Sequence, residues 1–141
     1  MKIRTTVISL AVAISFVILA ACGRTGSSSA EKTIKSTKSG DTTISLSSAS
    51  GEIKSGENDL TLSFTDAAGK HVDVPAASLK FHMPAMGAMA EMNDVATLTT
   101  TDKPGKFRAR VNIEAEGSWE AMISFQGLHG TEQATMDVNA K

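Results

Sequence analysis

Apolar and polar residues alternate with a period of two through most of the chain beyond residue 42. In Leu60–Thr65, for example, two leucines and a phenylalanine alternate with threonine, serine and threonine. Strict alternation is the pattern of a β-strand that buries one face and exposes the other to water. The pattern recurs in segments 44–47, 60–65, 78–82, 107–113, 119–125 and 134–138, and in a weaker form in 95–100.

Short turn sequences separate these segments. They read DAAG (Asp66–Gly69), KPGK (Lys103–Lys106), EAEGS (Glu114–Ser118) and QGLHG (Gln126–Gly130), and they contain residue types that turns favour. No segment has a clear helical period. About seven short strands in about 100 residues predict an all-β fold, an antiparallel immunoglobulin-like β-sandwich. Trp119 falls on an inward face and is expected in its core.

The start of the chain has the features of an export signal. Lys2 and Arg4 precede an apolar run, Val7–Ala21, as in a secretory signal peptide. The run is shorter than the about 20 residues that a membrane helix needs. The sequence LAAC, which ends at Cys22, resembles the bacterial lipobox, in which the cysteine is acylated and becomes the first mature residue. We therefore predict a signal peptide at residues 1–21 and a lipid anchor, palmitate included, on Cys22.

Charge and cysteine content argue against nucleic-acid binding and against internal disulfides in the mature protein. The precursor has 14 basic and 15 acidic residues, and loss of Lys2 and Arg4 leaves a net charge of −3. No basic patch stands out, so nucleic acid is not an expected partner. Cys22 is the only cysteine in the chain. No internal disulfide can therefore form, although an exported protein meets an oxidising compartment.

Residues 22–41 are expected to form a flexible tether. They are rich in Ser, Thr, Gly and Lys, with one large apolar residue, Ile34. Such a segment buries too little surface to offset its ordering entropy, and it would span about 25 Å on average. Residues 42–141 then suffice for one domain. The anchored domain would lie on the periplasmic side of the cell envelope. Gly23, in place of the aspartate that retains lipoproteins at the inner membrane, favours the outer membrane.

A methionine-rich stretch, FHMPAMGAMAEM (81–92), interrupts the alternation. The chain has seven methionines, and four fall here at a spacing of three: Met83, Met86, Met89 and Met92. Pro84 removes a backbone donor and Gly87 adds conformational freedom, so residues 83–94 are expected to leave the sheet. A helical or polyproline-like turn would bring the four side chains to roughly one side.

Three interpretations of these methionines remain open. Methionine fills irregular gaps, so the side chains can pack as core. They can form an adaptable surface for a partner protein. They can also bind a soft metal, because thioether sulfur prefers ions such as Cu(I) and its mimic Ag(I). His82, on the outward face beside Met83, could add an imidazole ligand or be an ordinary surface residue.

Several parts of the sequence resemble the YtkA-like family. They are the lipobox and tether, GENDLTLSFTDAAGK (56–70), MPAM (83–86) and GKF…EGSWEAMISF (105–125), and the similarity extends from about Ser55 to Val138. The resemblance implies a small, non-enzymatic, extracytoplasmic β-sandwich of the kind that accompanies copper handling or heavy-metal efflux. Family motifs often read MPxMxM, whereas two residues separate Met86 from Met89 here.

The order of the strands places the methionine stretch relative to other connections. If consecutive strands run antiparallel from residue 77, the loop 83–94 shares one end of the sandwich with the turn that holds Glu114 and Glu116. A cation at the methionines would then have acidic neighbours and the edge of the Trp119 indole nearby. His129 would lie at the other end. His71 is not assigned to either end.

The leading hypothesis from the sequence is a lipoprotein that takes up or hands over Cu(I) at an envelope membrane. Its ligands would come from the four methionines and His82. The alternative is a tethered interaction module that docks on an efflux, copper-trafficking or oxidase-assembly partner through the same methionines. An enzyme is not expected, because the histidines are scattered, the one cysteine is lipidated and no glycine-rich phosphate loop occurs.

Overall fold

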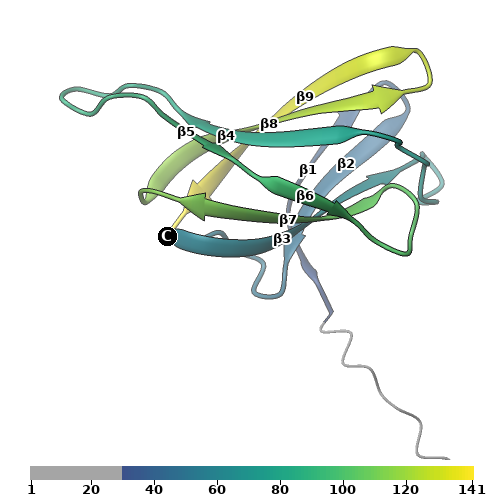
Figure 1. The fold of residues 1–141 in the computed structure, drawn as a ribbon, viewed down its shortest axis with the longest axis horizontal. Coiled ribbons are helices and arrows are strands. Elements are labelled where there is room, and N and C mark those ends of the chain that lie inside the picture. Colours follow the sequence, from purple (N-terminus) through teal and green to yellow (C-terminus); the bar gives the residue numbers. More distant parts are fainter. Residues whose placement is uncertain (1–29) are drawn as a thin grey trace, which may run out of the picture.

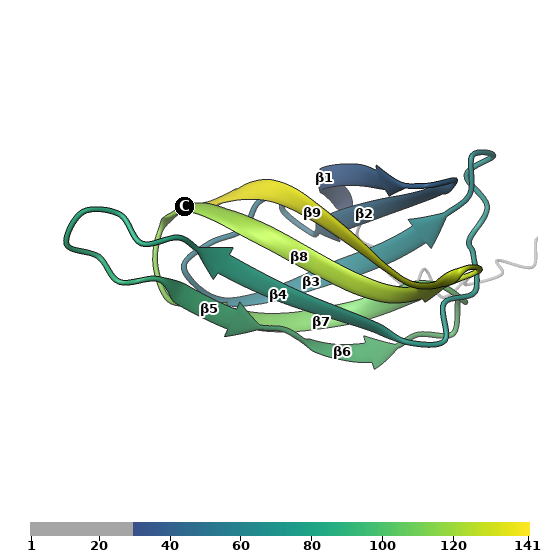
Figure 2. The ribbon, with the colours of Figure 1, turned by 90° about the horizontal axis from the view of Figure 1, so that it is seen from above.

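The computed structural model describes residues 30–141, which form nine β-strands and no helix. All paired strands are antiparallel. Sheet A has the order β1-β2-β3-β7-β6 and sheet B the order β5-β4-β8-β9, and the two pack face to face (Figure 1, Figure 2). The predicted antiparallel β-sandwich is confirmed, with more strands than expected. The strands are β1 (Lys32–Ser39), β2 (Thr42–Ser48), β3 (Gly56–Thr65), β4 (Ala77–Met83), β5 (Met92–Val95), β6 (Thr97–Thr100), β7 (Lys106–Ile113), β8 (Gly117–Gly127) and β9 (Gly130–Ala140).

The core consists of the inward residues of the alternating strands. In β8, Trp119, Ala121, Ile123 and Phe125 are all buried, and Trp119 is 1% exposed, as its inward position predicted. The ring of Phe64 in sheet A lies 4.9 Å, centroid to centroid, from the ring of Phe125 in sheet B. Removal of these two faces from water is the main favourable contribution to folding.

The expected boundary between tether and domain at residue 41 is wrong. Lys32–Ser39, assigned to the tether by its composition, forms β1 and pairs with β2. Ile34 packs against the core, and a turn at Gly40, with φ of 55°, returns the chain into β2. An edge strand satisfies its backbone groups on an existing neighbour, so it tolerates polar residues on both faces. The sandwich therefore begins about ten residues earlier than the composition indicated.

The export and anchoring predictions cannot be compared with the fold. The signal peptide (1–21), the lipidation site Cys22 and residues 23–29 of the tether lie outside the described residues. They stay predictions. Within residues 30–141, no helical segment has the length and hydropathy to span a bilayer.

The segment 95–100, expected as one weak strand, is divided between the two sheets. β5 pairs with β4 in sheet B, and β6 pairs with β7 in sheet A. Ala96 is the crossing point: its side chain is buried, and its N–H donates to the Leu79 carbonyl at 3.0 Å. This crossing fixes β5, and with it the base of the methionine stretch, to both layers.

The methionine stretch and the β7–β8 turn lie at the same end of the sandwich (Figure 1, Figure 2). The buried Asp94 carboxylate of β5 accepts a hydrogen bond from the Glu114 N–H at 3.1 Å, which joins the two connections. His129 lies in the β8–β9 turn at the opposite end. His71 is also there, bridged to the end of β3. The predicted placement of Glu114, Glu116 and His129 is confirmed.

Candidate functional site

The methionine stretch is a β-hairpin that extends past the end of the sandwich (Figure 1). Met83 pairs with Met92 at its base, and Met86 pairs with Met89 near its tip. At the tip, the Met86 N–H donates to the Met89 carbonyl at 3.1 Å, and the Met89 N–H donates to the Met86 carbonyl at 2.9 Å. The hairpin therefore contains two cross-strand methionine pairs, which we call the base pair and the tip pair.

A two-residue turn, Gly87 and Ala88, closes the hairpin. Gly87 has φ of 58°, and none of the non-glycine residues in the described part of the chain has positive φ. Glycine first, followed by a residue with negative φ, is the pattern of a type II′ turn, whose twist suits an antiparallel hairpin. The departure from the MPxMxM motif thus has a structural consequence, because two residues in place of one form the turn that lets Met86 face Met89.

The expected helical or polyproline-like turn is wrong, and the four methionines do not gather on one side. Cross-strand partners share a face, whereas residues an odd number apart along a strand point to opposite faces. Met83 and Met86 are three apart, so the base pair and the tip pair face opposite ways. The exposures agree: Met83 is 3% exposed, Met86 58% and Met89 49%, while Met92 is partly buried against the core.

The base pair belongs to the packed sandwich. Met83 lines the core, and its terminal methyl group lies close to Gly117 at the start of β8. A Cβ built at Gly117 would lie 3.2 Å from the Met83 Cε atom, so glycine here makes room for the methyl group. The core interpretation of the sequence therefore holds for Met83 and in part for Met92.

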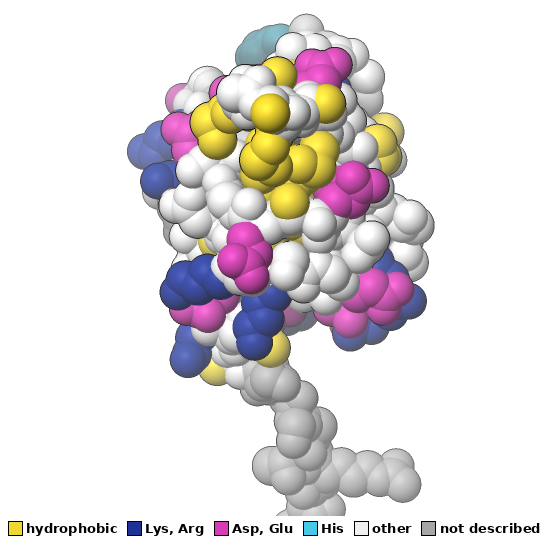
Figure 3. All heavy atoms as spheres, turned by 90° about the vertical axis from the view of Figure 1, so that its left-hand side faces the viewer, with side chains coloured by type: hydrophobic (Ala, Val, Ile, Leu, Met, Phe, Trp, Pro, Cys, Tyr) yellow, Lys and Arg dark blue, Asp and Glu magenta, His cyan; other side chains and the backbone are white. Residues whose placement is uncertain are grey.

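The tip pair is open to solvent. All residues from 84 to 91 are exposed, and Glu91 is the only charged residue among them. Figure 3 shows apolar side chains gathered at this end of the molecule. The Cβ atoms of cross-strand partners lie about 4.5–5.5 Å apart, so the flexible side chains of Met86 and Met89 can bring both sulfur atoms to one ion.

His82 lies away from the tip pair. It precedes Met86 by four residues along the strand, which corresponds to about 13 Å. Its Nδ1 atom lies 3.0 Å from the Asn93 side-chain oxygen. This contact joins the His82 ring to Asn93 on the neighbouring strand β5. The cross-strand neighbour of His82 on β8 is Glu120. The structure does not bring this histidine to the exposed sulfur atoms.

Trp119 is buried in the core and does not offer its indole edge to a ligand. Its Nε1–H donates to the Ala115 carbonyl in the β7–β8 turn at 3.0 Å, and the ring is buried. Within residues 30–141, no three His, Cys, Asp or Glu side chains come together as metal ligands would. At this end of the sandwich, the fold brings together two exposed thioether groups that could bind a metal, those of Met86 and Met89.

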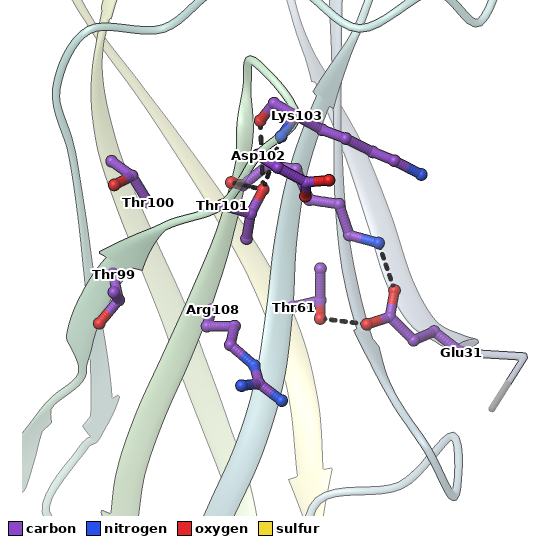
Figure 4. A pocket seen from close by; sticks show the side chains of 9 residues that line it. Glu31, Thr61, Thr99, Thr100, Thr101, Asp102, Lys103 and Arg108 are labelled. Atoms are coloured by element: carbon purple, nitrogen blue, oxygen red, sulfur yellow. Dashed lines mark hydrogen bonds and ion pairs between the residues drawn. The ribbon is translucent and has the colours of Figure 1, made fainter. Parts of the chain in front are cut away.

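Sequence reasoning did not identify a hollow of about 570 Å³ on the outer face of sheet A (Figure 4). Beside it, Glu31 accepts hydrogen bonds from the Lys106 ammonium at 2.8 Å and from the Thr61 hydroxyl at 2.6 Å. Lys106 first, and Thr61 second, hold the pKa of Glu31 below its ordinary value. These contacts fasten the beginning of β1 to β3 and β7. No local signal marks them, because the partners are 30 and 75 residues away.

We expect Glu31→Gln to destabilise the protein at pH 7 by less than about 1 kcal/mol, because the Glu31 side chain is 39% exposed and water screens such pairs. The folded-state pKa lies below the unfolded value of about 4.3. The contribution is therefore present above that value and is lost as the pH falls through the folded-state pKa. Urea melts of both proteins at pH 7 and pH 3 measure it. Equal differences at the two pH values would contradict a role for the ionised carboxylate.

The fold and the hairpin together define a small all-β sandwich that carries an exposed pair of thioethers. The chain belongs to the YtkA-like family, whose pattern matches residues 36–124, more than half of the 141 residues. The suspected resemblance is confirmed, although the match begins and ends earlier than the expected range of about 55–138. It starts within β1, ends within β8 and includes the whole hairpin. No curated protein and no solved structure matches the chain.

Proposed function

We propose that this protein is a membrane-anchored, extracytoplasmic module that binds Cu(I), or its mimic Ag(I), at the tip of the hairpin. The observation that supports the proposal is the cross-strand pairing of two exposed thioethers, Met86 and Met89. Thioether sulfur is a soft neutral donor suited to Cu(I). It has no proton to lose and cannot be consumed by disulfide formation, which suits an oxidising compartment. The proposed role is binding and transfer of the metal, without catalysis.

The proposed ligand set is narrower than the five residues predicted from the sequence. Met83 is buried in the core and Met92 is partly buried against it, and His82 is about 13 Å from the tip. In this proposal these three residues hold the hairpin in place and do not contact the metal. An ion at an exposed tip can be passed to another molecule without opening the sandwich.

Lipidation of Cys22 is part of the proposal and is supported by the LAAC sequence. The chain from Cys22 to Ala30 can reach at most about 30 Å when fully extended. The sandwich would therefore stay beside the envelope membrane, and Gly23 favours the outer one. The chain enters the sandwich at the bottom of Figure 1, whereas the hairpin projects at the upper left. An anchor on this side leaves the hairpin tip accessible.

A second candidate function is docking on a partner protein of the envelope. The supporting observation is that the exposed segment 84–91 is apolar except for Glu91, and exposed apolar patches often mark interaction sites. Replacement of methionine by leucine separates the two candidates. Leucine keeps the bulk and apolarity that a docking surface needs, but it lacks the sulfur atom that a soft metal needs.

We expect the double variant Met86→Leu/Met89→Leu to lose Cu(I) and Ag(I) binding. The test is an anaerobic titration of the mature chain against a Cu(I) competitor, with Cys22→Ser in every sample so that the thiol does not bind the metal. The matched control is Met83→Leu/Met92→Leu, which should retain binding. Both variants should remain folded, since volume-conserving swaps cost less than about 1.5 kcal/mol each. Loss of binding in the control alone, or unchanged binding in the tip variant, would overturn the proposal.

The same titration over pH tests the exclusion of His82. A thioether does not titrate, so the affinity should stay constant from pH 8 to pH 5. If the imidazole were a ligand, the affinity would fall in mildly acidic solution, because protons compete with the metal for the imidazole nitrogen. A pH-dependent loss of affinity that His82→Ala removes would return this histidine to the ligand set.

A further inference from the structure

We propose that the hairpin tip is half of a metal site and that a second copy of this chain completes it. One Cu(I) or Ag(I) ion would bridge two hairpins through Met86 and Met89 of each. This inference rests on the proposed function, since it requires that the tip binds the ion. It adds the stoichiometry, the partner and a metal-dependent change of assembly.

The first step is the number of donors. The tip pair supplies two neutral sulfur atoms, which is half of the donor set of a tetrahedral four-sulfur site. The base pair faces the opposite side of the hairpin, and Met83 is 3% exposed. Among residues 30–141, Met122 also has an exposed side chain. It lies on β8 opposite Lys80. Lys80 precedes Met86 by six residues, which corresponds to about 20 Å along an extended strand. The described fold thus provides no third thioether within reach of the tip.

The second step is access. The hairpin projects beyond the sandwich (Figure 1, Figure 2), so two copies can approach tip to tip without collision of their sheets. Gly87, which has no side chain, and Ala88 close the tip, and the nearby Ala85 and Ala90 are also small. Glu91 is the only charged residue in the exposed segment, so little repulsion opposes the approach. A bound cation would reduce the remaining repulsion between the two glutamates.

The third step is symmetry. A two-fold axis through the ion would present the same surface of each copy to the other, which is the commonest arrangement in protein dimers. Two sulfur atoms from each hairpin then give four donors, enough for a tetrahedral set. Without the ion, the contact would involve only the short exposed segments 84–91 of the two hairpins. That is far below the about 1,000 Å² that a stable interface needs, so the dimer should form only with metal.

The experiment is a titration of the full mature chain, carrying Cys22→Ser, with Ag(I). Calorimetry gives the stoichiometry, and light scattering after size exclusion gives the mass at each metal ratio. We expect a monomer without metal, an equivalence point at about half an Ag(I) ion per chain, and a doubling of the mass at that point. Met86→Leu/Met89→Leu should remain monomeric at every ratio, whereas Met83→Leu/Met92→Leu should dimerise like the parent.

The outcomes separate this inference from the proposed function. Binding of one ion per monomeric chain through the tip pair would overturn the inference and leave the proposed function intact. Absence of Ag(I) binding would overturn both. A dimer that forms without metal, or that persists in Met86→Leu/Met89→Leu, would show an apolar interface and overturn the metal bridge. Two ions per dimer would also overturn it, because each hairpin would then have a complete site.

Discussion

Trp119→Ala is expected to lower the free energy of unfolding by about 3–5 kcal/mol, the range for truncation of a large buried aromatic residue. The Trp119 side chain is among the largest fully buried ones in the described residues. Its removal would leave a cavity between the sheets, which the surrounding strands cannot close because their register is fixed by hydrogen bonds. It would also leave the Ala115 carbonyl without the indole N–H that donates to it at 3.0 Å.

Urea unfolding at pH 7 measures this loss. Trp119→Phe is the matched control, because phenylalanine keeps much of the buried bulk and removes the hydrogen bond. Its loss should be smaller than that of the alanine variant, and the difference reports the cavity. A loss below about 1 kcal/mol for Trp119→Ala would contradict the buried position. It would also reopen the possibility that the indole contacts a ligand at the hairpin end.

Gly105→Ala is expected to cost more than about 3 kcal/mol, because it combines backbone strain with a backbone clash. Gly105 has φ of 65°, and a Cβ atom there would overlap the Val72 carbonyl oxygen. The surrounding backbone is closely connected: the Phe64 N–H donates to the Gly105 carbonyl at 2.8 Å, and the Val72 N–H donates to the Phe64 carbonyl at 3.0 Å. An alanine could be accommodated only if these segments separated.

Gly40→Ala is the control for backbone strain alone, without a steric clash. Gly40 has φ of 55° in the β1–β2 turn, and beyond Gly40 and its two chain neighbours no atom lies within 4 Å of the position that a Cβ would take. Its substitution should cost only the strain of the left-handed conformation, about 1–2 kcal/mol. Thermal or urea melts of the two variants give the comparison. Equal losses would mean that the close approach at Gly105 has no energetic effect.

Local patterns were sufficient to predict most of the sandwich. The alternation in 107–113 became β7, with Phe107, Ala109, Val111 and Ile113 buried, because a period of two fixes which side chains share a face. The turn sequences likewise marked the ends of strands. The alternating order of the connections then placed Glu114 at the hairpin end and His129 at the other, which followed from antiparallel strands alone.

Composition failed where a strand depends on its neighbour. Lys32–Ser39 is polar and was expected to be a tether, yet it forms β1 along β2. Its stability comes from backbone pairing, from Ile34 against the core and from the contact of Glu31 with Lys106 and Thr61. The last of these joins residues far apart in sequence. A local reading of residue types contains no information on such partners.

The candidate site shows the same division. The sequence by itself determined the period-two sandwich and the presence of four methionines at a spacing of three around Pro84 and Gly87. That spacing fits a helical turn, a polyproline-like turn or a hairpin, so it could not determine which sulfur atoms meet. Only the tertiary structure decided this, because β8 fixes the position of β4, β4 pairs with β5, and their register continues into the tip. An odd spacing on a pleated strand then turns the base pair toward the core and the tip pair toward solvent.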